Sequence, residues 1–319
     1  MKPFPQGAAD LCIHCGLCLP TCPTFVETGS EVESPRGRIY LLKTLNENRF
    51  RLDETLAEPL DHCLGCLACE TSCPSGVPYR NLIEFYREQR TEKLGPRSRK
   101  ESLLINQLIP RPGLLEMLAN VYRLLGIHQL ARGLAKLLPS SRAQRSLLLA
   151  PKMQASRPSV LSAPSPQDGP ELWFHPGCIA DAFYPADQQD SVSLLRLAGY
   201  RVHRMDEVSC CGALAHHAGF QKRAEQHTSE LGQVLPPEQI LVPSAAGCAS
   251  HLKDQGMRVK SLARALLEAP QNLPVSFPGD FSIVVQDPCH ARHGLADGDA
   301  VGELLRSLGA NVVEPANQD

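Results

Sequence analysis

Two cysteine runs near the amino terminus constrain this chain more than any other feature of its sequence. Each run has the spacing Cys-x2-Cys-x2-Cys-x3-Cys-Pro, and their members are Cys12, Cys15, Cys18 and Cys22 before Pro23, then Cys63, Cys66, Cys69 and Cys73 before Pro74. A [4Fe–4S] cube needs one thiolate per iron, and three cysteines at i, i+3 and i+6 let one tight loop reach three irons of the same cube. The spacing therefore predicts two [4Fe–4S] clusters.

The fourth cysteine of each run points to the other cluster in proteins with two such runs. We therefore expect one cluster on Cys12, Cys15, Cys18 and Cys73, and the other on Cys63, Cys66, Cys69 and Cys22. Gly16 and Gly65 would let backbone amides approach the sulfides and tune the potential. Zinc is the main alternative, but zinc sites usually pair two Cys-x2-Cys knuckles, and a disulfide scaffold is less favoured still.

The composition is typical of a soluble globular protein, with 43% hydrophobic and 21% charged residues among 319. That length predicts two or three domains. The formal net charge of −2 gives no reason to expect a nucleic acid partner. The chain reaches its first cysteine by residue 12 without a secretory leader, so we expect a reducing, cytoplasmic location.

Leucines at helical spacing follow the cysteine runs and predict a helical segment over residues 96–150, after a cluster-binding domain over residues 1–95. Residues 97–157 contain 11 Lys or Arg against two Glu, a local balance of +9. A basic amphipathic helix can lie on an anionic membrane or an acidic partner. An ordinary helical linker with a solvated basic face is the alternative. A proline-rich linker is expected over residues 151–170.

Beyond the linker, short apolar runs at 172–174, 239–242 and 281–285 alternate with helical stretches at 190–197, 221–231 and 259–268. This alternation predicts an α/β cysteine-rich domain with a largely parallel sheet, after an amino-terminal module of α+β ferredoxin type or helical type. Residues around 175–202 recur around 286–312 at an offset of 110 or 111, which predicts one domain over 171–270 and the start of a second, truncated repeat over 271–319.

Four further cysteines form the carboxy-terminal candidate site: Cys178, Cys210, Cys211 and Cys248. Cys178 and Cys248 each follow a strand-like run, as does Cys289, and ligand groups gather beyond the carboxyl ends of parallel strands. We expect these positions to converge on a third metal or cluster site, binding a cluster or zinc, with buried free thiols as the alternative. Six histidines flank these cysteines as candidate ligands or proton carriers: His175, His216, His217, His251, His290 and His293.

Segments 12–24, 34–40, 63–77, 210–212 and 287–290 together resemble the iron–sulfur subunits of flavin-dependent dehydrogenases and the cysteine-rich heterodisulfide reductase subunits. Within that group the chain is most similar to the glycolate oxidase (glycolate dehydrogenase) iron–sulfur subunit family. It departs from the heterodisulfide reductase pattern, because His251 stands where that pattern closes with a cysteine, and it lacks a second Cys-Cys-Gly. The histidine puts a non-cubane cluster in doubt, and the missing Cys-Cys-Gly leaves Cys289 without its expected partners.

The resemblance implies an electron-transfer subunit that receives electrons from a separate flavin-containing dehydrogenase subunit and passes them to a membrane quinone. It implies no substrate-oxidising site on this chain, which has no Gly-x-Gly-x-x-Gly turn. A peripheral position on the inner face of the cytoplasmic membrane would follow. The alternatives are an iron–sulfur subunit for anaerobic glycerol 3-phosphate or lactate oxidation, or a thiol–disulfide reductase like heterodisulfide reductase.

Overall fold

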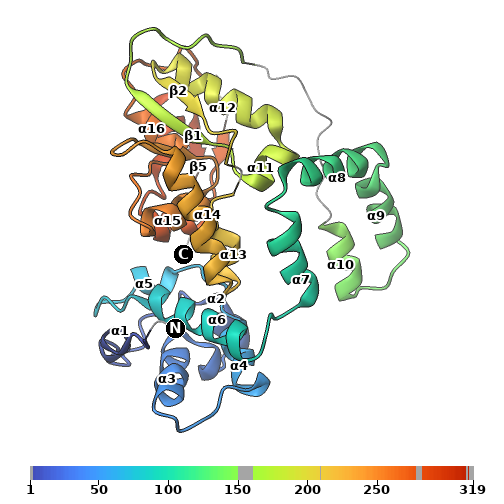
Figure 1. Ribbon diagram of the computed structural model, residues 1–319, viewed down its shortest axis with the longest axis vertical. Helices are drawn as coiled ribbons and strands as arrows, with labels where there is room; N and C mark the ends of the chain where they lie inside the picture. The colour runs from blue at the N-terminus through green and yellow to red at the C-terminus, as the bar shows by residue number, and fades with distance from the viewer. Residues whose placement is uncertain (1–2, 150–160, 209, 278–281, 314, 316–319) are drawn as a thin grey trace.

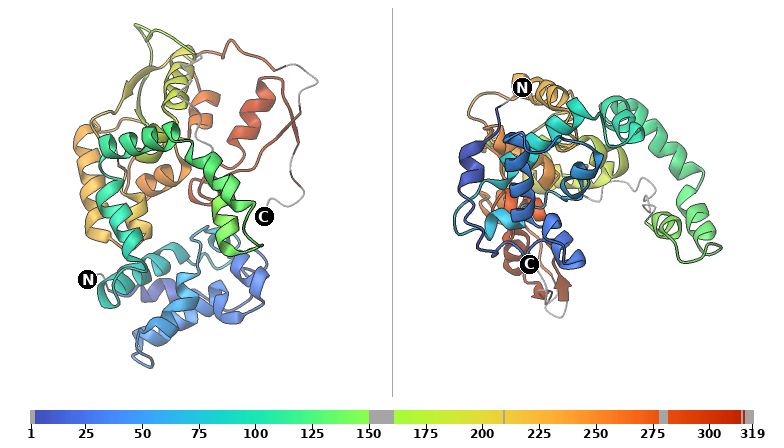
Figure 2. Two further views of the ribbon diagram at one scale, coloured as in Figure 1. Left: turned by 90° about the vertical axis from the view of Figure 1, so that its right-hand side faces the viewer. Right: turned by 90° about the horizontal axis from the view of Figure 1, so that it is seen from below.

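A computed structural model describes residues 3–149, 161–208, 210–277, 282–313 and 315 of the chain. Three parts follow one another along the sequence (Figure 1). An amino-terminal helical module occupies one end of the molecule, a helical lobe projects to one side, and an α/β region lies above the module. The right-hand view in Figure 2 shows the lobe, in green, projecting away from the other two parts.

The amino-terminal module consists of helices joined by the two cysteine loops. Its elements are α1 (Gln6–Asp10), α2 (Pro23–Thr28), the short helix η1 (Glu31–Glu33), α3 (Pro35–Asn46), α4 (Glu54–Asp61), α5 (Ala68–Thr71) and α6 (Tyr79–Lys93). The Ser34 side chain caps α3 by accepting the Gly37 N–H, and Pro35 takes the first helical position, where it leaves no donor unsatisfied.

The core of this module is the inner face of α6. Tyr79, Leu82, Ile83 and Tyr86 recur at helical spacing and are almost fully buried against α3 and α4. Residues 3–97 form helices and loops without a strand, so the α+β form of the expectation is wrong and the helical form is correct. The reason is local: apolar residues between and after the cysteine runs repeat every three or four positions, which buries one face of a helix.

The lobe consists of α7 (Arg99–Leu103), the π-helical turn η2 (Leu104–Leu108), α8 (Pro112–Leu124), α9 (Ile127–Ala135) and α10 (Arg142–Leu148). Leu115 and Ala119 of α8 are buried, and α8 packs on a helix of the α/β region. Residues 150–160, which include Pro151 and Pro158 of the expected linker, lie outside the described residues. Residues 161–170 form no helix or strand.

The α/β region contains a parallel three-stranded sheet of order β2-β1-β3, from β1 (Glu171–His175), β2 (Arg201–Arg204) and β3 (Leu241–Pro243). Between and after these strands run α11 (Cys178–Phe183), α12 (Pro185–Leu197), α13 (Ala213–His217), α14 (Gln221–Val234), α15 (Ala246–Asp254) and α16 (Leu262–Leu267). Leu172, Phe174 and Val242 of the sheet are buried with Leu195 of α12. The expected parallel sheet is confirmed.

A second, two-stranded parallel sheet pairs β4 (Ser282–Val284) with β5 (Asn311–Val313). The turn η3 (His290–Gly294) and α17 (Ala300–Ser307) lie between these strands. β4 and β5 stand at the offsets of 111 and 110 from β1 and β2, so both members of the sequence repeat form a parallel strand pair. Phe281, expected to begin this strand, lies outside the described residues.

The module and the α/β region meet along α6. Nε2 of His216 lies 3.0 Å from a carboxylate oxygen of Glu84, Arg80 forms an ion pair with Asp254, and the Thr91 hydroxyl donates to the Ala218 carbonyl at 3.1 Å. No helix in the described residues is both long enough and apolar enough to cross a bilayer.

Candidate metal centres

The two cysteine loops have the same backbone conformation. His14 and Gly16 have φ of 56° and 88°, and the residues 51 positions later, Gly65 and Leu67, have φ of 68° and 67°. In each loop one left-handed position is glycine, whereas the other is a residue with a Cβ atom, for which this conformation is sterically unfavourable. Left-handed residues in a tight loop turn successive N–H groups toward one side and form a concavity that favours anions. Both loops are therefore shaped to surround a negatively charged group.

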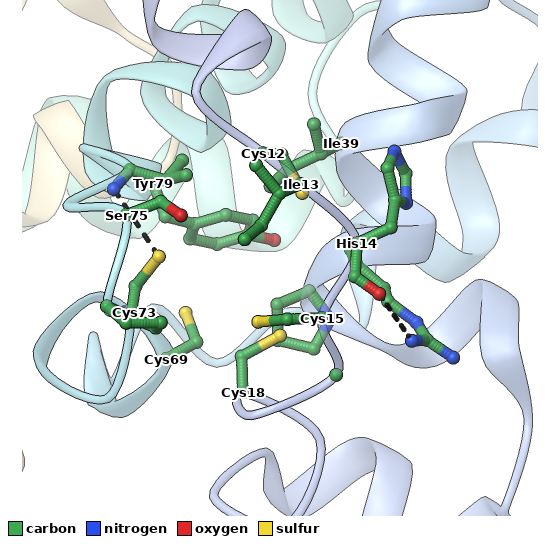
Figure 3. A pocket seen from close by; sticks show the side chains of 15 residues that line it. Cys12, Ile13, His14, Cys15, Cys18, Ile39, Cys69, Cys73, Ser75 and Tyr79 are labelled. Atoms are coloured by element: carbon green, nitrogen blue, oxygen red, sulfur yellow. Dashed lines mark hydrogen bonds between the residues drawn. The ribbon is translucent and has the colours of Figure 1, made fainter.

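The first cavity lies against the first loop. Cys12, Cys15, Cys18 and Cys73 direct their side chains toward it (Figure 3), and it encloses about 420 Å³. Ile39, Val77 and the buried ring of Tyr79 line the same space. Cys73 comes from the second run, so the cavity draws thiols from both runs.

The second cavity encloses about 330 Å³ and is lined by Cys63, Cys66, Cys69 and, from the first run, Cys22. Cys69 also lines the first cavity, as do Pro35 and Tyr79, so the two spaces are neighbours. The charges that act most strongly on Cys69 are those of Cys63, Cys66 and Cys22, ahead of Cys18. These neighbours favour assigning Cys69 to the set with Cys22, Cys63 and Cys66. The two four-cysteine sets remain predictions.

Hydrogen-bond donors surround the sulfur atoms of both sets. The Val77 N–H donates to Cys73 Sγ at 3.5 Å, the Tyr79 hydroxyl to Cys63 Sγ at 3.7 Å, and the Arg38 guanidinium to Cys22 Sγ at 3.8 Å. Such donors stabilise negative charge on sulfur and raise the potential of a bound iron–sulfur cluster.

Three arginines hold the loops. Arg36 donates to the His14 carbonyl at 3.0 Å, and Arg87 donates to the Cys63 carbonyl at 2.9 Å. Arg38 is 1% exposed and donates to the Pro59 carbonyl and to Glu33 at 2.7 and 2.8 Å. These cations offset the negative charge that four thiolates bring to each cavity.

Burial raises the pKa of the Cys18, Cys66 and Cys69 thiols. These thiols are therefore protonated near neutral pH unless a metal displaces the protons, and loading the site must release them.

The donor set fits [4Fe–4S] clusters. Each cavity has four thiols or more, and neither has an Asp or Glu among its described lining residues. In the part of the chain that the structure describes, no group of three or more His, Cys, Asp or Glu side chains could hold a single metal ion. Four cysteine thiols supply one ligand to each iron of a [4Fe–4S] cube.

The carboxy-terminal cysteines follow strands of the larger sheet, as expected, but they meet as two pairs. The Cys178 thiol hydrogen-bonds to Cys210, which lowers the pKa of Cys210 and raises that of Cys178. A hydrogen bond to Cys248 likewise raises the pKa of Cys211. A third metal or cluster site at these four residues remains a prediction.

Cys289, which also follows a strand, lies apart from this group. It is exposed and lines a separate, partly open cavity of about 1260 Å³ together with Cys66. The reason is topological: Cys289 follows β4, which pairs with β5 in a separate sheet, so its carboxyl edge is not that of β1 and β3.

Four of the six flanking histidines gather where α6 meets the α/β region. The rings of His216 and His251 lie 4.9 Å apart between centroids, and those of His217 and His290 lie 5.3 Å apart. Burial lowers the pKa of His217 to about 2 and that of His251 to about 4. Both rings are therefore neutral near pH 7. His175 is also fully buried with a pKa lowered to about 4 by burial, while His293 contacts the Thr71 hydroxyl at 2.9 Å.

Sequence reasoning missed Arg38, Arg87 and Tyr79 as supports of the cysteine loops. In the sequence, segment 34–40 indicated only a resemblance to iron–sulfur subunits, yet in the structure it supplies Pro35 and Arg38 to the cavity lining. Arg87 and Tyr79 lie on α6 without any motif, so only the packing of that helix could have identified them.

Comparison with known proteins agrees with this arrangement. Residues 8–77 match the family model of the 4Fe-4S dicluster domain, and residues 172–253 match that of the cysteine-rich domain. The probable glycolate oxidase iron-sulfur subunit of Bacillus subtilis is 27% identical over 349 residues, covering 98% of this chain and 78% of that protein. The glycolate oxidase iron-sulfur subunit of Escherichia coli is 28% identical over 328 residues, covering 95% of this chain and 76% of that protein.

Lactate utilization protein A of Geobacillus kaustophilus is 27% identical, but over only 77 residues, 24% of this chain and 32% of that protein. No solved structure is significantly similar. The expected resemblance to glycolate oxidase iron–sulfur subunits is thus confirmed over nearly the whole chain, and both the dicluster match and the cysteine content support iron–sulfur clusters.

Proposed function

We propose that this chain is the iron–sulfur electron-transfer subunit of a flavin-dependent glycolate dehydrogenase. One observation carries the proposal: the eight thiols of the two cysteine runs line two neighbouring cavities, and each cavity is lined by cysteines of both runs. The similarity to glycolate oxidase iron–sulfur subunits supplies the substrate of the complex. We expect this chain to have no substrate-oxidising site of its own.

Bound in the two cavities, a pair of [4Fe–4S] clusters would supply one-electron redox chemistry. The protein's own residues determine where that chemistry occurs and at what potential. Cys12, Cys15, Cys18 and Cys73 would hold one cluster, and Cys22, Cys63, Cys66 and Cys69 the other. Tyr79 and Pro35 line both cavities, while Arg38 places a buried positive charge beside Cys22.

The proposed partner is a separate flavin-containing subunit that oxidises glycolate, and the proposed acceptor is a membrane quinone. A cytoplasmic protein, peripheral on the inner face of the membrane, would have access to both. The flavin would take up two electrons from the substrate together, whereas the clusters of this chain would pass them on one at a time.

Anaerobic reconstitution with the flavin subunit tests this proposal. The chain, loaded with iron and sulfide, is mixed with a catalytic amount of that subunit, and bleaching of its broad absorbance near 400 nm is followed on adding glycolate, lactate or glycerol 3-phosphate. We expect about eight irons per chain and bleaching with glycolate, followed by recovery of the colour on adding a short-chain quinone. A colourless chain with bound zinc would overturn the proposal.

The alternative within the class of iron–sulfur electron-transfer subunits is that this chain accepts electrons from a lactate or glycerol 3-phosphate dehydrogenase. The similarity to lactate utilization protein A favours lactate, but it covers only 24% of this chain, whereas the glycolate oxidase similarity covers 95% or more. Bleaching with lactate and not with glycolate would decide for this alternative.

Thiol–disulfide reduction is a second candidate function. It is favoured by the hydrogen bond from Cys178 to Cys210, because the lowered pKa of Cys210 increases its thiolate fraction and hence its reactivity. This function predicts that the chain alone, without a flavin subunit, reduces a small disulfide and that Cys210→Ser abolishes the reaction.

A further inference from the structure

In the helical lobe many leucine side chains are exposed while several alanines are buried. On α8 the small residue Ala119 is 1% exposed, while Leu124 is 86% exposed. On α9, Ala131 and Ala135 are buried, while Leu130 and Leu134 face outward. A water-soluble helix normally buries its leucines and exposes its small or polar residues. Here Leu115 of α8 is buried, but most of the other large apolar side chains of the two helices are exposed.

The exposed leucines follow the helical repeat and so form stripes. On α8 the exposed apolar residues are Met117, Leu118, Val121, Leu124 and, directly after the helix, Leu125. On α9 and the turn after it they are Leu130, Leu134, Leu137 and Leu138. Spacings of three, four and seven place the members of each set on one side of their helix. The opposite side of α8, with Leu115 and Ala119, packs on α11.

The lobe is also the most basic part of the chain. Residues 97–149 contain nine Lys or Arg against Glu101 and Glu116. Arg132 and Lys136 are exposed on α9, one turn apart and away from its leucine stripe. A helix with leucines on one face and cations on its polar face is the pattern of a helix that lies in the plane of an anionic membrane.

We propose that the outward leucine stripes of α8 and α9 bind the surface of an anionic lipid bilayer. This inference builds on the proposed delivery of electrons to a membrane quinone, and it assigns the contact to particular side chains. The alternatives are an acidic protein or a second copy of this chain. An acidic protein would also be matched by the cations, but leucine on one face of a helix with cations on its polar face is the pattern of a helix lying in the plane of an anionic membrane.

Contacts with the α/β region fix the position of the lobe. Ile105 of η2 and Ile109 pack in one cluster with Cys178 and Cys210, and Arg123 of α8 donates to the carbonyls of Ala182 and Phe183 at 3.0 and 2.8 Å. These contacts fix the lobe to the α/β region on the side that carries Cys178 and Cys210.

Vesicle sedimentation with the full, iron-loaded chain tests the inference. Vesicles of phosphatidylcholine alone are compared with vesicles containing about 30% phosphatidylglycerol. We expect binding to the anionic vesicles, weakened by salt, and little binding to the neutral ones. The variant Leu124→Glu/Leu137→Glu should bind the anionic vesicles at least tenfold more weakly, and Arg132→Gln/Lys136→Gln roughly tenfold more weakly.

The control is Phe50→Glu/Val234→Glu, which changes two exposed apolar side chains outside the lobe and should bind as the unchanged chain does. Vesicle binding equal in the leucine variant and the unchanged chain would overturn the inference. So would an unchanged chain that forms a dimer in solution while the leucine variant is monomeric, or one that binds no vesicle. Iron content and bleaching by a reduced dye are measured on every variant, so a failure of the proposed electron-transfer function is recognised separately from a failure of membrane binding.

Discussion

In the amino-terminal module cysteines line two cavities of about 420 and 330 Å³, whereas in the α/β domain four cysteines meet in two hydrogen-bonded pairs. The first arrangement keeps the thiols around a space, supported by loops with left-handed residues and by arginines. In the second, thiols reach one another at the ends of strands and the pairs are buried by apolar side chains. The same residue type thus surrounds a space in one region and meets other thiols directly in the other.

The largest expected effect is on iron content, in double Cys→Ser variants whose two cysteines belong either to the same proposed set or to different sets. Cys63→Ser should leave about four of eight irons, and adding Cys22→Ser should remove no more, because both residues serve one cluster. Adding Cys12→Ser to Cys63→Ser should instead remove nearly all iron. Iron and sulfide counting after anaerobic purification, with electron paramagnetic resonance, makes the distinction. Equal iron contents in the two double variants would show that the proposed exchange of the fourth cysteines is wrong.

Acid should weaken the contact between the two regions through its buried histidines. His217 and His251 have pKa values of about 2 and about 4 in the folded chain, both below the ordinary value of 6.5. The unfolded chain therefore takes up protons first, and stability falls as the pH drops below about 6.5. Each ring contributes about 1.4 kcal/mol per pH unit, which gives about 4 kcal/mol for both between pH 6.5 and 5.

Denaturant unfolding at pH 7 and pH 5 measures this loss, with His217→Gln/His251→Gln as the comparison. The double variant should lose about 4 kcal/mol less than the unchanged chain over that interval. An identical acid loss in both proteins would show that carboxylates elsewhere, and not these rings, govern the acid response.

A smaller effect is expected at Arg38, which places its charge 3.8 Å from Cys22 Sγ. Arg38→Met removes a buried cation beside the second cavity, so adding an electron there becomes less favourable and the reduction potential of one cluster should fall by on the order of 100 mV. Arg38→Lys should restore most of the loss, and Arg51→Met, which alters an exposed arginine of the same module, should shift neither potential. Redox titration followed by electron paramagnetic resonance resolves the two clusters.

The smallest effect on cluster content is expected from the paired thiols of the α/β domain. Cys178→Ser/Cys248→Ser removes one member of each pair, yet it should leave the iron content and the spectrum of the amino-terminal clusters within error of the unchanged chain, since neither residue lines their cavities. Loss of additional iron or of zinc in this variant would instead reveal a third metal site, and metal analysis detects either.

Several elements followed from sequence patterns alone. The apolar runs near Trp173 and Leu241 predicted β1 and β3. The cysteine spacing predicted cluster loops whose two backbones are indeed alike. These features depend on residues a few positions apart, so the chain's own dihedral preferences and local hydrogen bonds suffice to specify them.

Features that join distant segments were decided by tertiary packing. The sequence did not reveal that Arg87 would reach the Cys63 carbonyl, that the cysteines of the α/β domain would divide into two pairs, or that Cys289 would face Cys66 across another cavity. It showed leucines at helical spacing in the lobe, but not that they would face outward while alanines were buried. The spacing of residues along a chain determines which side of a helix or loop they share, whereas the way those elements pack determines what each side meets.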